Sequence, residues 1–126
     1  MQPIQLFELA SKQAHWLTVR QTVVAGNIAN ANTASYAARD VAPFEAVLEQ
    51  TNMRMAATHS RHYAEDAIRS SVNEVGVEDG IDILPSGNTV DLPDELAKTS
   101  EIKQQYQMNA GLVKSFHRMM LMTVRR

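Results

Sequence analysis

Two histidines three residues apart, His59 and His62, are the first residues in this sequence that could do chemistry. On a helix they would share one face and could offer imidazole nitrogens to a zinc ion. A zinc site needs a third or fourth ligand, and Arg61 between the histidines adds an unfavourable positive charge. The pair therefore indicates a solvated loop.

An acidic group follows at Glu78, Asp79 and Asp82, where carboxylates offer the oxygen ligands that calcium prefers. The spacing of an EF-hand loop and its closing glutamate are missing, so these residues indicate a polar turn. The sequence also lacks a nucleophile elbow, a P-loop and a glycine-rich dinucleotide fingerprint. We therefore assign no catalytic, cofactor-binding or metal-binding residue, and we expect a protein that is not an enzyme.

The composition and net charge exclude further classes. A chain of 126 residues, 44% of them hydrophobic, fits one domain with a modest core, to which a partner could add burial. Its net charge of -2 offers no basic field to a nucleic acid, and the absence of cysteine excludes disulfides and thiolate metal sites. Neither a cleaved signal peptide nor a transmembrane segment is expected from the pattern of apolar residues.

The first segment, residues 1–33, is predicted to be a long helix. From Ile4 to about Ala31 the chain contains no proline, and Pro3 suits a first-turn position. Mostly apolar residues recur at alternating spacings of three and four, which is the pattern of a coiled-coil-like seam. This first seam consists of Phe7, Ala10, Ala14, Leu17, Gln21, Val24, Ile28 and Ala31.

The last segment, residues 91–126, repeats this pattern. Asp91 can cap a helix whose first turn contains Pro93, Asp94 and Glu95, so the acids lie near the positive end of the helix dipole. We therefore predict a mainly α fold in which the two long terminal helices form an antiparallel, coiled-coil-like hairpin. The second seam consists of Thr99, Ile102, Tyr106, Asn109, Val113, Phe116, Met120 and Thr123.

A register for this hairpin follows if the polar seam residues match, because a buried amide pair fixes alignment at some cost in stability. Gln21 would then lie beside Asn109. The apolar pairs that this register predicts are Leu17 with Val113, Val24 with Tyr106, and Ile28 with Ile102. The residues assigned to assembly and packing are Phe7, Leu17, Val24, Ile28, Ile102, Tyr106, Val113, Phe116 and Met120.

Each helix also carries apolar residues away from its seam, which a two-helix hairpin would leave exposed. Exposed apolar stripes typically mark association surfaces, so we expect other subunits to bury them, with Trp16 as a contact anchor. Two alternatives remain, a third helix from the middle that covers these faces and a Trp16 that is only a partly covered aromatic. The off-seam residues are Leu6, Leu9, Trp16 and Val23 on the first helix and Met108, Leu112, Met119 and Met122 on the last.

The middle segment, residues 34–90, is predicted to be loop-rich and partly extended or flexible. Residues 44–55 can form a short helix, whereas residues 58–73 are polar and charged without steady periodicity, so we expect low order there when the protein is alone. Between Val75 and Thr89, glycine and proline punctuate short alternating runs, which indicates an extended or hairpin-like segment.

The end of the first helix combines amides with small apolar residues in the sequence NIANANTASY, residues 27–36. Its polar side chains can satisfy backbone groups where the helix ends. The sequence resembles the N-I-A-N-x-x-T-P-G-Y signature of flagellar rod and hook proteins, with matches at Asn27, Ile28, Ala29, Asn30, Thr33 and Tyr36. Further matches lie at residues 38–40, 44–45 and 87–91, and the short chain resembles the proximal rod members more than the longer hook and distal rod proteins.

This resemblance implies a structural subunit of the bacterial flagellar basal-body rod, which polymerises helically through its terminal helices and transmits motor torque. It implies export by the flagellar type III apparatus without a cleaved signal peptide, and a place in the basal body, spanning the periplasm. The implied partners are other copies of the chain, other rod proteins, the FliE adaptor, and export-gate or membrane-ring components at the rod base. No cofactor is implied.

The sequence departs from the signature at Ala34 and Ser35, which replace its Pro-Gly pair. Proline would fix one dihedral angle and glycine would allow a positive φ, so a turn of a different type or a longer first helix is open here. An alternative function is a cytoplasmic helical adaptor or export chaperone that holds one partner with the same amphipathic faces. A third class is a small metal-dependent enzyme built around His59 and His62.

Overall fold

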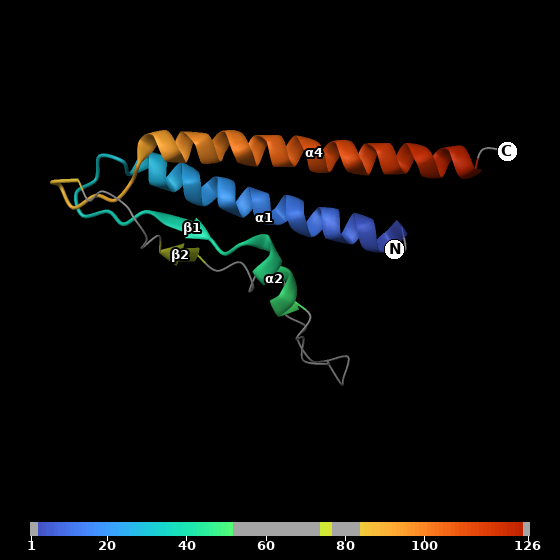
Figure 1. The fold of residues 1–126 in the computed structure, drawn as a ribbon, viewed down its shortest axis with the longest axis horizontal. Helices are drawn as coiled ribbons and strands as arrows, with labels where there is room; N and C mark the ends of the chain where they lie inside the picture. Colours follow the sequence, from blue (N-terminus) through green and yellow to red (C-terminus); the bar gives the residue numbers. More distant parts are fainter. Residues whose placement is uncertain (1–2, 52–73, 77–83, 125–126) are drawn as a thin grey trace.

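The fold is an antiparallel pair of long helices, as predicted. The computed structural model describes residues 3–51, 74–76 and 84–124. Helix α1 covers Pro3–Ala29 and helix α4 covers Leu92–Val124. The two helices lie side by side, and α4 continues past the start of α1 (Figure 1). The predicted helical hairpin is confirmed.

The helix ends follow from local chemistry. Pro3 is the first residue of α1, where its missing N–H is not needed. Helix α4 begins directly after Asp91, whose carbonyl accepts a hydrogen bond from the Glu95 N–H at 3.0 Å, and its first turn contains two acids. Helix α1 ends at Ala29, two residues before the predicted end, and a series of turns follows.

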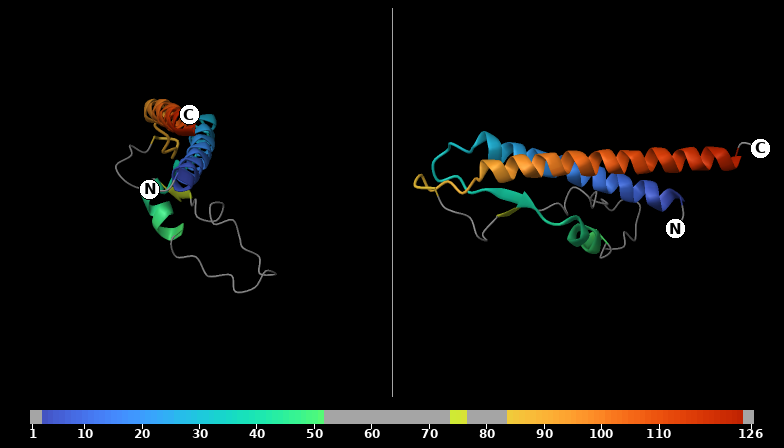
Figure 2. Two further views of the ribbon diagram at one scale, coloured as in Figure 1. Left: turned by 90° about the vertical axis from the view of Figure 1, so that its right-hand side faces the viewer. Right: turned by 45° about the horizontal axis from the view of Figure 1, so that its top comes forward.

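In the sequence, three short elements lie between the two long helices, and the first of them packs against α1. Strand β1 covers Arg39–Val41, helix α2 covers Phe44–Thr51, and strand β2 covers Glu74–Gly76. The strands pair antiparallel, with Asp40 opposite Val75. Figure 2 shows β1 and α2 on one side of the hairpin. The predicted short helix is present as α2, although its expected residues 52–55 lie outside the described part of the chain.

Several sequence predictions fall on residues that the structure does not describe. The expected low order of residues 58–73 is among them, as are the residues considered for metal binding, namely His59, His62, Glu78, Asp79 and Asp82. Of the expected extended segment after residue 74, the structure describes β2 and residues 84–91.

The core lies where the hairpin meets β1 and α2. Leu17, Val24 and Ile102 are buried between the long helices, and Val41 and Val47 from the middle segment join the same cluster. The seams therefore supply the centre of the core, and the middle segment extends it across one side of α1.

The predicted register is wrong by roughly one heptad. The Asn109 side chain donates a hydrogen bond to the Ala10 carbonyl at 2.8 Å, and Gln21, its predicted partner, is exposed. The rings of Phe7 and Phe116 meet edge to face with centroids 5.7 Å apart, whereas the predicted register places Phe7 beside Thr123. A heptad shift keeps the same two faces in contact, so the seam pattern does not distinguish these registers.

The prediction that Trp16 anchors a neighbouring subunit is also wrong, because its own chain covers it. Its indole N–H donates to the Ala42 carbonyl at 2.9 Å, and its ring centroid lies 5.8 Å from that of Phe44. The Arg20 guanidinium lies 5.5 Å from the centroid of the indole ring. The middle segment thus covers part of α1, although the alternative interpretation expected a third helix to cover the off-seam faces of both long helices.

The off-seam residues of α4 behave differently. Its four off-seam apolar residues are all more than half exposed, whereas Leu6, Leu9 and Val23 on α1 are partly buried. The hairpin therefore has one long helix with an uncovered apolar line. The α4 residues concerned are Met108, Leu112, Met119 and Met122.

Candidate functional site

The residues of the N-I-A-N motif lie at the closed end of the hairpin, in what we call the junction. The junction consists of residues 26–40, residues 84–91 and the first turns of α4. These parts of the chain lie next to one another at the end of the hairpin opposite the start of α1 (Figure 1). The two stretches that match the family signature, residues 27–36 and 87–91, are far apart in the sequence but lie together in the junction.

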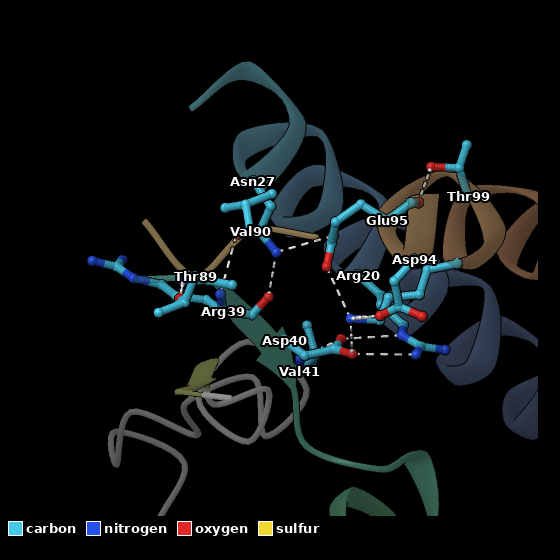
Figure 3. Close-up of polar contacts among 12 residues, drawn as sticks. Arg20, Asn27, Arg39, Asp40, Val41, Thr89, Val90, Asp94, Glu95 and Thr99 are labelled. Atoms are coloured by element: carbon cyan, nitrogen blue, oxygen red, sulfur yellow. Dashed lines mark hydrogen bonds and ion pairs between the residues drawn. The ribbon is translucent and has the colours of Figure 1, made fainter. Parts of the chain in front are cut away.

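Asn27 is the centre of the junction and is fully buried. Its side-chain N–H groups donate to the Arg39 carbonyl at 2.6 Å and to the Glu95 carboxylate at 3.0 Å (Figure 3). Its side-chain oxygen accepts from the Arg39 N–H at 3.1 Å and from the Tyr36 hydroxyl at 3.4 Å. One amide therefore uses its full hydrogen-bonding capacity to join α1, β1 and α4.

Asn88 provides hydrogen bonds to the carbonyl groups that follow the end of α1. It is fully buried, and its side-chain nitrogen lies 2.8–2.9 Å from the carbonyl oxygens of Asn30, Ala31 and Thr33. Its side-chain oxygen accepts from the Val90 N–H at 2.7 Å. Carbonyls at a helix end lack partners within the helix, so Asn88 caps the exit from α1 from a distant part of the chain.

The remaining motif residues work locally. Asn30 donates from its side chain to the Gly26 carbonyl at 2.8 Å, and the Thr33 hydroxyl donates to the Asn30 side-chain oxygen at 3.2 Å. Ile28 is partly buried against the core, and Ala29 is exposed. The amides and the threonine thus satisfy backbone groups where α1 ends, and Ile28 continues the seam.

The turn after Thr33 keeps a left-handed residue although the sequence lacks the glycine of the typical motif. Ser35 has φ 57°, and Gly87, which faces it, has φ 75°. The Ser35 N–H donates to the Ser86 carbonyl at 3.0 Å, and a Cβ on Gly87 would lie 3.4 Å from the Ser35 hydroxyl. The departure at residues 34–35 therefore leaves a strained serine in the turn and does not lengthen the helix.

Ser35→Gly is expected to raise the free energy of unfolding by roughly 0.5–1 kcal/mol. Left-handed backbone costs an L-residue about 1–2 kcal/mol, which exceeds the roughly 0.5–1 kcal/mol that glycine adds through its freedom in the unfolded chain. Urea unfolding followed by circular dichroism measures the change. The control is Ala34→Gly, which removes no positive φ and should lower stability. If the Ser35→Gly chain were less stable than the parent, the backbone of Ser35 would not be strained.

A group of charges extends the junction along α4. The Glu95 carboxylate is buried, and Lys98 lies 2.9 Å from it and 3.1 Å from Asp94. Burial acts to lower the pKa of Lys98, but hydrogen bonds to Glu95 and Asp94 and their negative charges outweigh it and raise the pKa above 10.5. The Asp40 carboxylate on β1 lies 3.1 Å from the Arg20 guanidinium of α1 and 3.8 Å from the Lys98 ammonium group of α4. The charged group therefore connects the same three elements as Asn27.

Apart from Ile28, the residues assigned to packing lie along the hairpin rather than in the junction. Leu17, Val24 and Ile102 meet in the core, and Phe7 meets Phe116 near the open end. The other α4 residues of this set are less covered: Val113 and Met120 are partly buried, and Tyr106 is 52% exposed.

Sequence reasoning missed the importance of Asn88 and Glu95. Asn88 lay within the matched stretch 87–91, and that match was the only signal for it. Glu95 was interpreted as a first-turn acid that complements the helix dipole, and the structure shows that it is also a buried partner of Asn27. Burial of a polar side chain depends on distant parts of the chain, which a local pattern does not report.

The described residues offer no centre for catalysis by a metal. Within residues 3–51, 74–76 and 84–124, no three or more histidine, aspartate or glutamate side chains gather so as to hold a metal ion. In the same ranges, no helix combines the length and the apolar character needed to cross a membrane. The chemistry of the junction is structural: it fixes how α1, β1 and α4 meet.

Comparison with known proteins agrees with the motif. No protein-family model matches the chain. The chain is 54% identical to the flagellar basal body rod protein FlgB of Agrobacterium fabrum, in an alignment that covers all of this chain and 97% of that protein. Identity at this level over the full length, together with the N-I-A-N motif at the end of a long helix, shows that the chain belongs to the FlgB family of flagellar basal body rod proteins.

Proposed function

We propose that this structural rod subunit polymerises through α1 and α4, and that the packing of these helices carries motor torque. The uncovered apolar line on α4 is the observation that supports this proposal. Its residues are 51–68% exposed, and burial of such side chains among neighbours is favourable. Helix α4 also extends beyond the start of α1, so its last turns are free to reach another subunit (Figure 1).

The junction gives this helix pair a fixed geometry. Asn27 and the charged group tie β1 to both long helices, and Asn88 holds the turn that leaves α1. A subunit that bears torque must keep the angle between its elements under load, and buried hydrogen-bond networks are rigid when all their members are paired. We infer that the motif residues Asn27, Ile28, Ala29, Asn30, Thr33 and Tyr36 set the direction in which the chain leaves the packed helices.

Membership of the family supports further expectations about place and partners. The subunit would pass through the flagellar type III apparatus without a cleaved signal peptide and lie in the part of the rod that spans the periplasm. Its neighbours would be copies of itself, other rod proteins, the FliE adaptor and components of the export gate or membrane ring. Its role would be structural and would require no enzymatic activity.

An adaptor or export chaperone would use the same amphipathic helices differently. It would be fully folded alone, whereas a rod subunit with an uncovered helix should gain helix when it assembles. Circular dichroism of the isolated chain, compared with the chain in an assembled rod fraction, separates the two functions. A chain that is absent from purified basal bodies would contradict the rod function.

Leu112→Glu is expected to lower incorporation into basal bodies at least about tenfold while the isolated chain keeps its helix content. Leu112 is 54% exposed, so the charge is tolerated in the monomer but would be unpaired in a helix interface. Ser100→Glu, which adds the same charge at an exposed polar position of α4, is the matched control and should incorporate normally. Val24→Asp should abolish incorporation by disrupting the core itself. Normal motility of the Leu112→Glu strain would count against the interface.

A further inference from the structure

Two neighbouring hollows between α1 and α4 together form what we call the α1–α4 groove. Two hollows of about 450 and 500 Å³ lie between the helices, and Tyr106 lines both of them. Together they extend from Phe7 to Thr22 on α1 and from Thr99 to His117 on α4. With a rise of 1.5 Å per residue, the α1 side of this α1–α4 groove is roughly 22 Å long.

The groove has the character of an unfinished helix interface. One half is floored by the small residues Ala10, Ser11, Ala14 and Ala110, which allow a third helix to approach closely. Asn109 lines the same half, and its buried side-chain oxygen lacks a hydrogen-bond partner among the described residues. A buried acceptor without a donor is unfavourable, so the Asn109 side-chain oxygen would gain from a hydrogen-bond donor that a partner brings into the groove.

The same chain carries an apolar ridge on a second face of α4. The ridge is the face of α4 with alternating spacings of four and three, and its apolar part from Met108 to Met122 is about 21 Å long. None of its residues lines either hollow, so ridge and groove are separate faces of one molecule. The ridge consists of Glu101, Gln105, Met108, Leu112, Ser115, Met119 and Met122.

We propose that the α1–α4 groove of one subunit receives the α4 ridge of a second copy of the chain, with the two α4 helices parallel. This inference rests on the proposed polymerisation. A helical array relates its subunits by rotation and translation along one axis, so equivalent helices that follow this axis point the same way. A ridge and a groove on different faces make a head-to-tail contact that can repeat without closing.

Charge complementarity supports the parallel arrangement. Lys103 lines the end of the groove that lies nearer the junction, and Glu101 forms the same end of the ridge. The Glu101 carboxylate accepts a hydrogen bond from the Gln105 side chain at 2.9 Å and lies 3.7 Å from the Arg20 guanidinium. Its side chain is nevertheless 52% exposed, which leaves room for a further cation from a neighbour. Parallel seating with little axial offset brings this carboxylate to the Lys103 ammonium group of the next copy and places Met108 and Leu112 beside the half of the groove with the small residues. Met119 and Met122 then lie beyond His117, where the groove ends.

Photo-crosslinking from the groove tests this contact. The full chain with Tyr106→p-benzoylphenylalanine is produced in flagellated cells, which are irradiated before basal bodies are purified. We expect a crosslinked dimer of two copies whose crosslink maps to residues 101–122, in at least about tenfold excess over the control. The control carries the same photoreactive residue at Glu49, an exposed position on α2.

The other outcomes are distinguishable. A crosslink from residue 106 to a different rod protein, or to residue 106 of a second copy, would overturn the proposed contact while leaving the rod function intact. The same holds if the chain is present in basal bodies and yields no dimer. Absence of the unsubstituted chain from basal bodies, tested in parallel, would instead contradict the proposed function and with it this inference.

Discussion

Asn88→Ala is expected to lower the free energy of unfolding by about 3 kcal/mol, a large part of the roughly 5–15 kcal/mol of a typical domain. The side chain is fully buried, and it bonds to three carbonyls and one N–H. Each such bond contributes about 0.5–1.5 kcal/mol net, and buried groups left without a partner cost more. Urea unfolding measured by circular dichroism gives the change.

Asn88→Asp separates the two sides of this amide. The variant keeps an acceptor for the Val90 N–H, but it places a carboxylate against the carbonyls that the Asn88 nitrogen now contacts. It should therefore be less stable than Asn88→Ala at neutral pH. Asn32→Ala, at an exposed asparagine of the same turn, is the control and should change stability by less than about 0.5 kcal/mol. Parental stability of Asn88→Asp would show that the side-chain nitrogen caps nothing.

Asn27→Asp is expected to cost about 3–5 kcal/mol at neutral pH, the usual cost of an uncompensated buried charge. The introduced carboxylate would lie about 3.0 Å from the Glu95 carboxylate and would lose both donations that Asn27 makes. The like charge and the burial raise the pKa of the introduced carboxyl group in the folded chain above its unfolded value. Its penalty is therefore smallest below the unfolded pKa and grows as the pH rises through the folded pKa.

Thermal unfolding of Asn27→Asp and the parent between pH 4 and pH 7 measures this growing difference. Adding Glu95→Gln provides the matched second variant, because its amide can donate to the introduced carboxylate. The double variant should recover part of the stability and lose most of the added pH dependence. A constant difference between Asn27→Asp and the parent across this range would be incompatible with two facing carboxylates.

The helices and their facing sides could be predicted because they depend on local patterns. Pro3, Asp91 and the spacing of residues such as Leu17, Val24 and Ile102 are visible in the sequence, and each acts within a few turns of its own helix. The register could not be predicted in this way, because seams that repeat every heptad fit one another at several offsets. The junction contact between Asn27 and Glu95 holds one offset in the folded chain.

The covering of Trp16 and the role of Asn88 were beyond the same reasoning for a different reason. Both depend on pairing between segments that are far apart in the chain, as in the bonds of Trp16 to Ala42 and of Asn88 to Thr33. The sequence leaves the path of the turn after Thr33 open, because Ala34 and Ser35 replace the Pro-Gly pair of the family signature. The structure keeps a positive φ at Ser35, which neither the signature nor the propensity of serine establishes.

The cap that Asn88 provides can form only late in the synthesis of the chain. Its partners Asn30 and Ala31 precede it by 58 and 57 residues, so a growing chain completes the end of α1 long before the side chain that caps it exists. Until residue 88 emerges, the carbonyls of the turns that follow α1 depend on water or on local hydrogen bonds such as that from the Thr33 N–H to the Asn30 carbonyl at 2.9 Å. Closing so long a loop carries an entropic cost that local contacts avoid. The junction can therefore be completed only after residue 88 of 126 has been made, and the hairpin later still, because α4 covers Leu92–Val124.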